Sequence, residues 1–511
     1  MESLVNTVNS IIWSPALVVL CLAAGLFYSI LTRFAQVRHF KEMVRLLFSP
    51  NESSKGISSF QALAVTLSGR VGAGNIAGVA AAIGFGGPGA IFWMWVVAFL
   101  GASTAYAEST LGQVYKEEVD GQYRGGPAYY FEKALGQKWL GILFALSAVL
   151  ACGIFLPGVQ ANVVGNAVTQ VFGDGTMVET YFGDVGMHKV TALAVILIVL
   201  GFIIFGGIKR IAHFTQVVVP FMALAYIIMA MIIVFLNLDK VPGVFSLILG
   251  DAFTAKAGFG AAIGWGVKRG IYSNEAGQGT GPHASSAAEV DHPAQQGLVQ
   301  AFSVYVDTLF VCTATALMIL ITQQYNVITE DFDLLTGAGA VIVQNVPLTT
   351  EVASSAFTQL ALSSMFGHLG QVFVGVALFF FAFTTILAYY YIAETNVAYL
   401  TRYLNQKNSM LFMVKLVIMF MVAYGTVNQA GYIWNMGDIG VGLMAWINIL
   451  GILAIFFVAK PAIMCLRDYE EQKKAGGPIR FDPVKLGIHN APFWEKRLAK
   501  QQAEDAKSNN S

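Results

Sequence analysis

The sequence predicts an all-α polytopic membrane protein with 11 transmembrane helices, in which one extra N-terminal helix precedes two inverted repeats of five helices. The first observation is composition: of 511 residues, 56% are hydrophobic and only 12% are charged, with a mean hydropathy of +0.63. A soluble domain carries about 25% charged residues. The second observation is a series of apolar runs that approach or exceed the roughly 20 residues a helix needs to cross a bilayer. The third is that glycines and polar residues interrupt two of these runs.

The apolar runs follow one another along most of the chain. Their approximate bounds are residues 12–32, 60–84, 88–114, 141–171, 189–207, 212–237, 259–281, 297–323, 366–398, 410–427 and 438–459. The run at 366–398 is longer than a bilayer requires, so we expect its helix to tilt. These runs are too long for the short alternating strands of an outer-membrane barrel.

Basic residues indicate how the helices cross the membrane. Ile11 to Leu31 has no basic residue before it and is long for the apolar part of a cleavable signal peptide, so it is interpreted as the first transmembrane helix. Under the positive-inside rule, the loop lysines and arginines place the N-terminus outside and the C-terminus in the cytoplasm. The basic loops on the cytoplasmic side are Arg33–Lys55, Lys116–Lys138, Lys209–Arg210 and Arg402–Lys407. We expect a multi-pass protein of a bacterial cell (inner) membrane.

The first interruption is Ser68 to Gly78, SGRVGAGNIAG, near the middle of the second run. It contains four glycines, each of which costs on the order of 1 kcal/mol in a helix interior. Non-helical backbone inside a membrane is tolerated only where protein or a water-filled cavity satisfies it, and an interrupted helix is typical of a transporter's binding site. Close packing through small residues would explain the glycines, but it leaves Arg70 and Asn75 unexplained.

The second interruption lies within Gly264 to Gly281, GWGVKRGIYSNEAGQGTG, which mixes glycines with charged and amide side chains. When the first helix is set aside, ten helices remain, and each group of five starts with one interruption. The first interrupted helix enters from the cytoplasm and the second from outside, as in secondary transporters with a site at the membrane midplane. The predicted divisions are 1–57 for the extra helix and its loop, 58–240 and 241–460 for the repeats, and 461–511 for a charged, partly disordered cytoplasmic tail.

A broken helix exposes N–H groups at one end and C=O groups at the other. The N–H end suits a carboxylate, and the carbonyl end suits a bare cation such as sodium. A substrate carboxylate would therefore bind backbone N–H groups between Gly72 and Asn75, with the Asn75 amide as a further donor. The alternative for Asn75 is an interhelical hydrogen bond unrelated to binding.

Arg70 is expected to form an internal ion pair or gate, since an intramembrane charge needs a partner. Its candidate partners are Glu108, Asp307, Glu275 and Glu394. Glu108 and Asp307 are themselves interpreted as structural partners of Arg70 or Lys268, with proton relay as the alternative.

Two later runs offer polar side chains to the same site. Gln160 follows the Pro157–Gly158 irregularity and is interpreted as a cavity residue, with a packing hydrogen bond as the alternative. Thr385 and Tyr389 are four residues apart and share a helix face. The Thr384 and Thr385 hydroxyls could complete an oxygen shell for sodium, or they could bond their own helix instead.

Three blocks of the sequence resemble the alanine-or-glycine:cation symporter family, that of the sodium:alanine symporters. The blocks are GNIAGVAAAI (Gly74–Ile83), GGPGAIFWMWVVAFLG (Gly86–Gly101) and VKRGIYSNEAG (Val267–Gly277). The resemblance extends over essentially all eleven runs, and Phe92–Trp95 is its most specific part. It implies a leucine-transporter-type core of five plus five helices after one extra helix. It also implies sodium-coupled uptake of a small neutral amino acid, typically alanine or glycine.

The resemblance further implies a set of site residues. The substrate site would comprise Ala73, Gly74, Asn75, Gln160, a helix break near Ile263 and Gly264, Thr385 and Tyr389. The sodium site would use backbone carbonyls of Arg70, Val71 and Gly72 with the hydroxyls of Thr384 and Thr385. Sodium would be the coupling ion, with no other cofactor and no catalytic residue.

Two positions depart from the family's pattern. The family commonly has threonine where this chain has Ala73, and Gly-Trp where it has Ala388–Tyr389. Because these changes alter the size and polarity of the pocket, the alternative is a sodium- or proton-coupled symporter for a larger polar amino acid such as glutamine or serine.

Other classes of function fit the sequence less well. An ion channel would need a continuous polar pore, whereas these polar residues cluster at two helix breaks. An enzyme is not expected, because the sequence has no metal-ligand cluster, nucleophile elbow or phosphate loop. The net charge of zero gives no footprint for nucleic acid. We expect a monomer in the lipid bilayer whose partners are Na⁺ and a small neutral amino acid.

Overall fold

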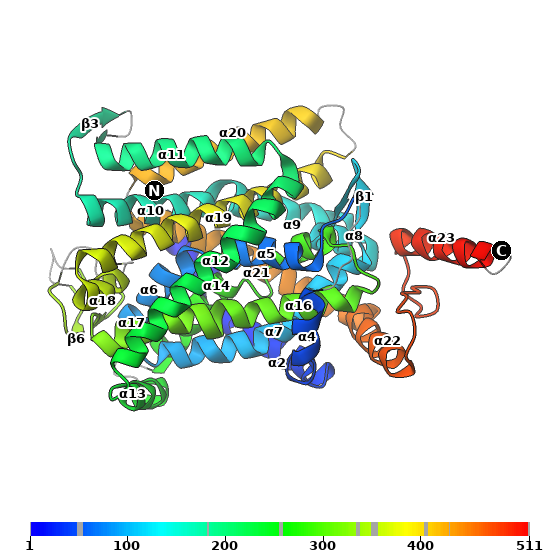
Figure 1. Cartoon of the computed structure of the whole chain (residues 1–511), viewed down its shortest axis with the longest axis horizontal. Helices are drawn as coiled ribbons and strands as arrows, with labels where there is room; N and C mark the ends of the chain where they lie inside the picture. Colours follow the sequence, from blue (N-terminus) through cyan, green and yellow to red (C-terminus); the bar gives the residue numbers. More distant parts are fainter. Residues whose placement is uncertain are drawn as a thin grey trace.

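A computed structural model describes residues 2–48, 55–180, 183–254, 259–333, 338–348, 356–402, 407–428 and 430–508. Within these ranges the chain forms a bundle of helices, most of which run roughly side by side (Figure 1). Nine helices in this part of the chain are long and apolar enough to cross a membrane. They span Ser3–Leu31, Ala90–Val114, Lys138–Phe172, Met187–Ile204, Gly207–Leu236, Pro293–Thr322, His368–Leu400, Lys407–Val427 and Gly431–Val458.

Two further apolar runs are each divided into shorter helices. The first consists of α5 (Ser59–Arg70), the π-helical turn η1 (Gly74–Gly78) and α6 (Val79–Gly86). The second consists of α14 (Phe259–Asn274) and α15 (Gly281–Ala287). Both predicted interruptions therefore occur, whereas the number of eleven transmembrane helices stays a prediction.

The remaining elements follow in chain order. Before the first broken helix come α1 (Glu2–Ile12), α2 (Pro15–Leu31), α3 (Ala35–Arg38) and α4 (Phe40–Leu47). Between the broken helices come α7 (Ala90–Val114), β1 (Glu117–Val119), β2 (Gln122–Arg124), α8 (Pro127–Leu135), α9 (Lys138–Leu150), η2 (Ala151–Phe155), α10 (Leu156–Phe172), β3 (Met177–Thr180), β4 (Gly183–Gly186), α11 (Met187–Ile204), α12 (Gly207–Leu236) and α13 (Val241–Thr254). After them come α16 (Pro293–Val304), η3 (Tyr305–Cys312), α17 (Thr313–Thr322), β5 (Asn326–Ile328), β6 (Val341–Gln344), α18 (Ala356–Phe366), α19 (His368–Leu400), α20 (Lys407–Val427), α21 (Ala430–Val458), α22 (Pro461–Ala475) and α23 (Pro492–Ser508). The six strands pair as three antiparallel hairpins, β1–β2, β3–β4 and β5–β6.

Local signals explain where several helices begin. Proline is the first residue of α2, α8, α16, α22 and α23, where its missing N–H costs no intrahelical hydrogen bond. The first broken helix begins with a capping box: Gln61 N donates to Ser58 Oγ at 3.2 Å, and Ser58 N donates to Gln61 Oε1 at 3.0 Å. This cap fixes the start of α5 three turns before the break.

The broken helices lie inside the bundle. α7 packs against α2, α14 and α16, while α10 packs against α19 and α20. α5 contacts α12 and α19, and α14 contacts α6 and α7. Every residue from Ala62 to Gly84 and from Arg269 to Val290 is buried. Backbone freed at the breaks must therefore find its partners within the protein.

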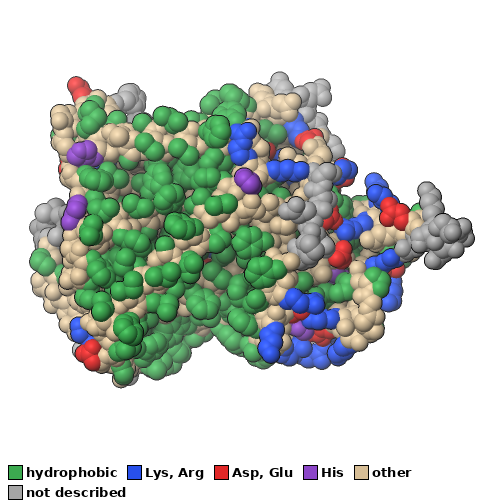
Figure 2. Space-filling view, viewed as in Figure 1, with side chains coloured by type: hydrophobic (Ala, Val, Ile, Leu, Met, Phe, Trp, Pro, Cys, Tyr) green, Lys and Arg blue, Asp and Glu red, His purple; other side chains and the backbone are tan. Residues whose placement is uncertain are grey.

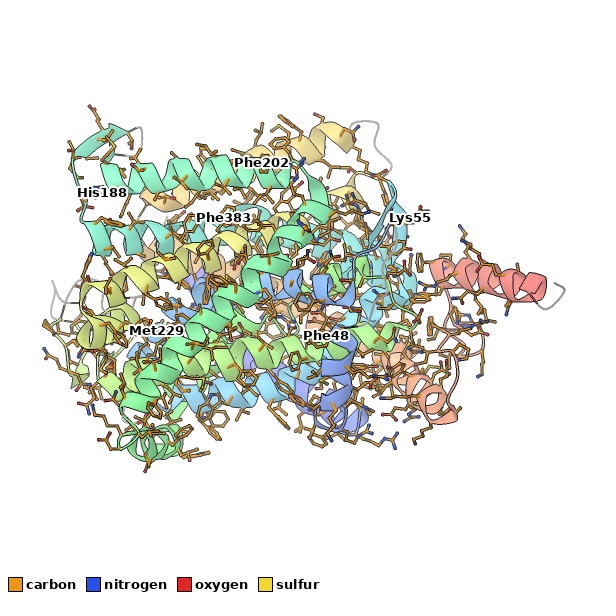
Figure 3. The ribbon with its side chains drawn as sticks, viewed as in Figure 1. Phe48, Lys55, His188, Phe202, Met229 and Phe383 are labelled. Carbon is orange, nitrogen blue, oxygen red and sulfur yellow. The ribbon has the colours of Figure 1, made fainter. Side chains whose placement is uncertain are left out.

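The outer surface is apolar between the two ends of the bundle. Figure 2 shows hydrophobic side chains across the middle of one face and Lys and Arg gathered at the end that carries the C-terminus. In Figure 3, His188 and Lys55 mark the two ends, and Phe202 of α11, 72% exposed, lies on the outer surface. This pattern fits a protein surrounded by lipid.

One segment differs from the sequence analysis. Residues 241–254, to which no helix was assigned, form α13; at 14 residues this helix is too short to have been counted as a span. The tail was expected to be partly disordered; the described part of it contains α22 and α23, and the extent of disorder stays a prediction. Phe481 and Trp494 of the tail are buried, so a few apolar side chains in a charged segment suffice to dock it.

Gly425 allows α20 to approach α10 closely, because a Cβ atom there would lie 2.2 Å from Gly158 O. We expect Gly425→Ala to destabilise the protein by about 1–3 kcal/mol, the usual cost of overpacking, measured by thermal unfolding in detergent. The control is Gly201→Ala in α11, where the nearest atom would be Met419 Cε at 3.8 Å. An unchanged melting temperature for Gly425→Ala would contradict the close approach.

Candidate functional site

The first helix break follows Arg70, where α5 ends. Val71 has backbone angles of φ −80° and ψ 83°, outside the helical range, and helical structure resumes at Ala73. A Cβ atom on Gly72 would lie 2.4 Å from Thr385 Oγ1 and 3.1 Å from Gln160 Oε1. The backbone of the break can therefore approach these two side chains only because residue 72 is glycine.

Side-chain oxygens accept hydrogen bonds from the N–H groups freed at this break. Gly72 N donates to Asn75 Oδ1 at 2.8 Å, and Ala73 N donates to Gln160 Oε1 at 2.9 Å. Asn75 and Gln160 are both buried. A carboxylate is a stronger acceptor than a neutral amide oxygen, so a carboxylate could replace Gln160 as the acceptor from Ala73 N. The structure thus brings together Ala73, Gly74, Asn75 and Gln160.

Thr385 of α19 faces the carbonyl side of the same break. Its Oγ1 lies 2.7 Å from Ser68 O and 2.8 Å from Phe381 O. The hydroxyl has one proton and can donate to only one carbonyl at a time, so three oxygen atoms converge here. Thr384 points elsewhere: its Oγ1 donates to carbonyls of its own helix and lies 3.8 Å from Met222 Sδ of α12. The structure therefore brings Thr385, and not Thr384, to the break.

The backbone carbonyls expected to bind sodium are engaged in the break itself at two of the three positions. Arg70 O accepts from Gly72 N at 3.0 Å, and Gly72 O accepts from Asn75 N at 3.2 Å. Ser68 O is instead the carbonyl next to Thr385. Ser68 was not predicted as a sodium ligand. The carbonyls without intrahelical donors are those of the last turn of a helix, and the sequence did not show that α5 ends at Arg70.

The second helix break lies between α14 and α15. Its backbone has positive φ at Glu275 (56°), Gly277 (85°) and Gly279 (79°), a region that favours glycine. The predicted position near Ile263 and Gly264 is wrong, because α14 continues through both residues. A Cβ atom on Gly264 would meet nothing within 4 Å, so this glycine borders open space instead of marking the break.

Glu108 of α7 satisfies the backbone of the second break. Its carboxylate accepts from Gly277 N at 3.2 Å, from Gly279 N at 3.0 Å and from Asn448 Nδ2 at 2.7 Å. Asn448 is close enough for its Nδ2 to bond Gly277 O as well, at 2.9 Å. The partners of Glu108 are thus backbone groups and an amide, whereas the sequence suggested basic side chains.

Asp307 of η3 joins the two breaks. Its Oδ1 accepts from Asn75 Nδ2 at 2.6 Å and lies 3.0 Å from Ser273 Oγ, while Oδ2 accepts from Thr308 Oγ1 at 2.7 Å. Asn75 belongs to the first break, and Ser273 immediately precedes the second. Asn75 thus holds Gly72 N through Oδ1 and makes the interhelical hydrogen bond of the alternative interpretation through Nδ2. Its role as a donor to a substrate carboxylate stays a prediction.

Arg70 is fully buried beside these groups. Its Nη1 donates to Gln300 O at 3.1 Å and also bonds Ser303 Oγ. Among the described residues, no ion pair within 4.0 Å includes Arg70. Glu275, Glu108 and Asp307 are the carboxylates that lie near it. The fourth candidate, Glu394, pairs with Arg124 at 3.1 Å.

A buried ion cluster that the sequence analysis missed lies between α14 and α21. Lys268 Nζ is 2.7 Å from Asp438 Oδ2, and Arg269 Nη1 is 2.8 Å from Asp438 Oδ1. The Arg269 guanidinium also lies over the rings of Trp265 (5.0 Å) and Trp434 (5.1 Å). The available signal was an aspartate at the start of an apolar run, which needs a basic partner in another helix.

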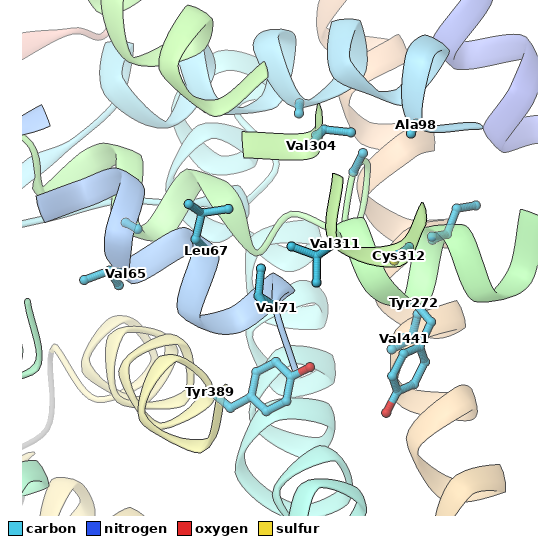
Figure 4. Packing of buried hydrophobic residues seen from close by; sticks show 14 of the residues in the cluster. Val65, Leu67, Val71, Ala98, Tyr272, Val304, Val311, Cys312, Tyr389 and Val441 are labelled. Carbon is cyan, nitrogen blue, oxygen red and sulfur yellow. The ribbon is translucent and has the colours of Figure 1, made fainter. Parts of the chain in front are cut away.

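Two buried tyrosines flank the first break. In Figure 4, Tyr389 on α19 points toward the end of α5, where Val71 lies, and Tyr272 projects from α14. A Cβ atom on Gly74 would lie 3.1 Å from the Tyr272 ring, so α14 packs directly on η1. Tyr389 was predicted as a site residue, whereas Tyr272 was missed although it lies within the second interrupted stretch.

Comparison with known proteins gives a consistent result. A model of the sodium:alanine symporter family matches residues 1–483. YrbD of Bacillus subtilis (strain 168) is 53% identical over 500 residues, covering 97% of this chain and 98% of that protein. The sodium/proton-dependent alanine carrier protein of Bacillus sp. (strain PS3) is 46% identical, with 91% and 100% covered. The sodium/alanine symporter AgcS of Methanococcus maripaludis is 37% identical, with 89% and 94% covered.

A solved structure supports the fold. The crystal structure of MhsT in complex with L-phenylalanine resembles this chain with a TM-score of 0.54 at 15% identity, covering 81% of this chain and 97% of that one. The likeness shows the leucine-transporter-type fold that the sequence resemblance implied.

We expect Asp438→Asn to destabilise the folded protein by about 3–5 kcal/mol, because it leaves two buried basic groups without a counter-charge. The free energy of unfolding in detergent measures this loss. The control is Asp120→Asn, which removes the 60% exposed partner of Lys407 at 2.5 Å and should cost less than about 1 kcal/mol. Equal losses in the two variants would argue against a buried, tightly paired Asp438.

Proposed function

Because the chain belongs to the sodium:alanine symporter family, we propose that it couples sodium entry to uptake of alanine or glycine by alternating access. It is a multi-pass membrane transporter and not an enzyme. The observation that carries the proposal is the first helix break. N–H donors that suit a carboxylate lie after the break, at Gly72 and Ala73, and oxygens that suit a cation lie before it, at Ser68 O and Thr385 Oγ1.

The N–H side of the break is the proposed seat of the substrate carboxylate. Ala73 N would exchange Gln160 Oε1, its acceptor at 2.9 Å, for a carboxylate oxygen. Gly72 N is held by Asn75 Oδ1 of the same segment, so the Asn75 side chain would keep the break in shape as the substrate binds. The exchange keeps every N–H group satisfied, so binding requires no unpaired donor in the empty or loaded state.

The carbonyl side of the break is the proposed sodium site. Thr385 Oγ1 already lies 2.7 Å from Ser68 O and 2.8 Å from Phe381 O, and hard cations prefer oxygen ligands. The Val71 carbonyl remains a candidate fourth ligand from the sequence resemblance. Sodium would then hold these oxygens together in place of the hydroxyl's hydrogen bond, and the hydroxyl would keep its proton and turn it away from the ion.

A small substrate fits the crowding around the break. Tyr272 packs against Gly74, and Tyr389 is buried on the opposite side (Figure 4). The names of the relatives from Bacillus sp. and Methanococcus maripaludis point to alanine. Glutamine or serine stays the alternative, since Ala73 removes a hydroxyl that the family commonly has.

The orientation and setting of the protein complete the proposal. We place the end of the bundle that carries α22 and α23 in the cytoplasm, because basic side chains gather there (Figure 2). The N-terminus would then lie outside a bacterial inner membrane, and the protein would act as a monomer in the bilayer.

Uptake by the purified protein in proteoliposomes tests the proposal. An inward sodium gradient should drive accumulation of labelled L-alanine that saturates, prefers one enantiomer and stops when an ionophore collapses the gradient. A second experiment applies a pH gradient without sodium. Equal uptake in that experiment would identify protons, and not sodium, as the coupling ion, and uptake without saturation would favour a channel. Competition by glycine, serine and glutamine ranks the substrates.

Thr385→Val should raise the sodium concentration for half-maximal uptake by about tenfold or more. The lost oxygen's interaction with an ion is worth about 1.5–3 kcal/mol, and each 1.4 kcal/mol is tenfold. Valine preserves the shape of threonine, so the maximal rate at saturating sodium should change less. The control is Thr384→Val, since the Thr384 hydroxyl faces its own helix and Met222. A larger sodium effect in the Thr384 variant would place the cation elsewhere.

A further inference from the structure

The C-terminal helix α23 is anchored by its first turn. Trp494 is the largest fully buried side chain in the described part of the chain, and its Nε1 donates to Gln113 O at 2.8 Å in the last turn of α7. Its ring meets those of Phe481 at 5.2 Å and Phe493 at 5.5 Å, both edge-on. Beyond this turn α23 projects from the body of the bundle (Figure 1).

Lys116 connects this anchor to the second broken helix. The side chain is fully buried, and its ammonium lies over the rings of Tyr123 (4.4 Å), Phe493 (4.5 Å) and Trp494 (5.3 Å). It also donates to Ala288 O at 2.9 Å, directly after α15. A desolvated ammonium packed on aromatic faces is a favourable arrangement. Two of these rings, Phe493 and Trp494, belong to the C-terminal tail.

Arg497 reaches the same segment from the next turn of α23. Its guanidinium forms a hydrogen-bonded ion pair with Glu289 and lies 3.5 Å from Asp291. Glu289 also accepts from Tyr123 Oη at 2.9 Å. The tail therefore contacts this segment in two ways. Arg497 pairs with Glu289, and Phe493 and Trp494 pack on Lys116, which donates to Ala288 O.

Residues 287–289 are the place where the two broken helices meet at this end of the bundle. Ile57 N, just before α5, donates to Ala287 O at 3.0 Å, and Glu289 N donates to Ile57 O at 2.9 Å. These bonds form a parallel bridge between Ile57 and Ala288. A passage from the first break to this end would require α5 and α15 to separate, and the bridge would then break.

We propose that α23 is a strap that keeps the Ile57–Ala288 bridge closed, with Trp494 and Arg497 as positioning residues for this gate. Release of the two side chains would accompany opening of this end, so the strap sets how often the gate opens. The inference rests on the proposed function only in assuming that this end opens during transport.

The test is the rate at which a buried thiol next to the bridge reacts with a soluble maleimide. Ser286→Cys places that thiol on α15, at a fully buried position, and the four native cysteines are buried and so give a low background. Adding Arg497→Ala should raise the labelling rate by about tenfold, the effect expected from losing one charge-assisted hydrogen bond. The matched control is Lys500→Ala on the same helix, where Lys500 is 79% exposed and pairs only weakly with Glu504 at 3.8 Å.

A second variant guards against misfolding. Trp494→Phe keeps an aromatic anchor but loses the hydrogen bond to Gln113 O, and it should give a smaller increase in labelling. All variants are checked for a monodisperse elution profile and an unchanged melting temperature. Labelling rates that stay at the control value in both Arg497→Ala and Trp494→Phe would overturn the strap. Because labelling needs no substrate, a faster rate without sodium-driven uptake would reject the proposed function and keep the strap.

Discussion

Two helices break inside a bundle that excludes water, and each backbone group freed there needs a partner within the protein. Several polar side chains at the centre of the molecule help to meet this requirement. Gln160 and Asn75 accept from the first break, Glu108 accepts from the second, and Asp307 bonds both Asn75 and the Ser273 side chain. Since these partners are side chains, a ligand with a carboxylate can take the place of one of them without leaving a donor unpaired. In the proposed function, binding would be an exchange of hydrogen bonds at a preformed site.

The same backbone segment would couple the two ligands of the proposed function. Gly72 and Ala73 carry the donors, while Ser68 O, one turn earlier, lies beside Thr385. A cation bound at Ser68 O and Thr385 Oγ1 would fix the position of the N–H groups of Gly72 and Ala73. Binding of the cation would then strengthen binding of the carboxylate, which is positive coupling between two sites. Away from this centre, two further contacts join the broken helices to other elements. Asp438 with Lys268 and Arg269 ties α14 to α21, and the Ile57–Ala288 bridge near α23 ties the start of α5 to the end of α15.

The sequence was sufficient wherever composition or glycine content carried the signal. The apolar runs, the first break at Ser68–Gly78 and the pairing of two interrupted helices could all be predicted, because burying charged groups or glycines in a membrane helix is costly. The second break could not be located, since its glycines extend over several turns and only tertiary contacts, such as those of Glu108 with Gly277 and Gly279, decide where the helix ends. Asp438 and Trp494 were missed for a related reason: each depends on a partner far away in the chain.

The central claim is that one helix break binds the substrate carboxylate on one side and sodium on the other. Linked binding measured by calorimetry on the purified protein tests it most directly. If the claim is right, saturating sodium tightens alanine binding by some factor, and saturating alanine tightens sodium binding by the same factor; Thr385→Val should shrink both factors together. An alanine affinity that is independent of sodium would contradict the account.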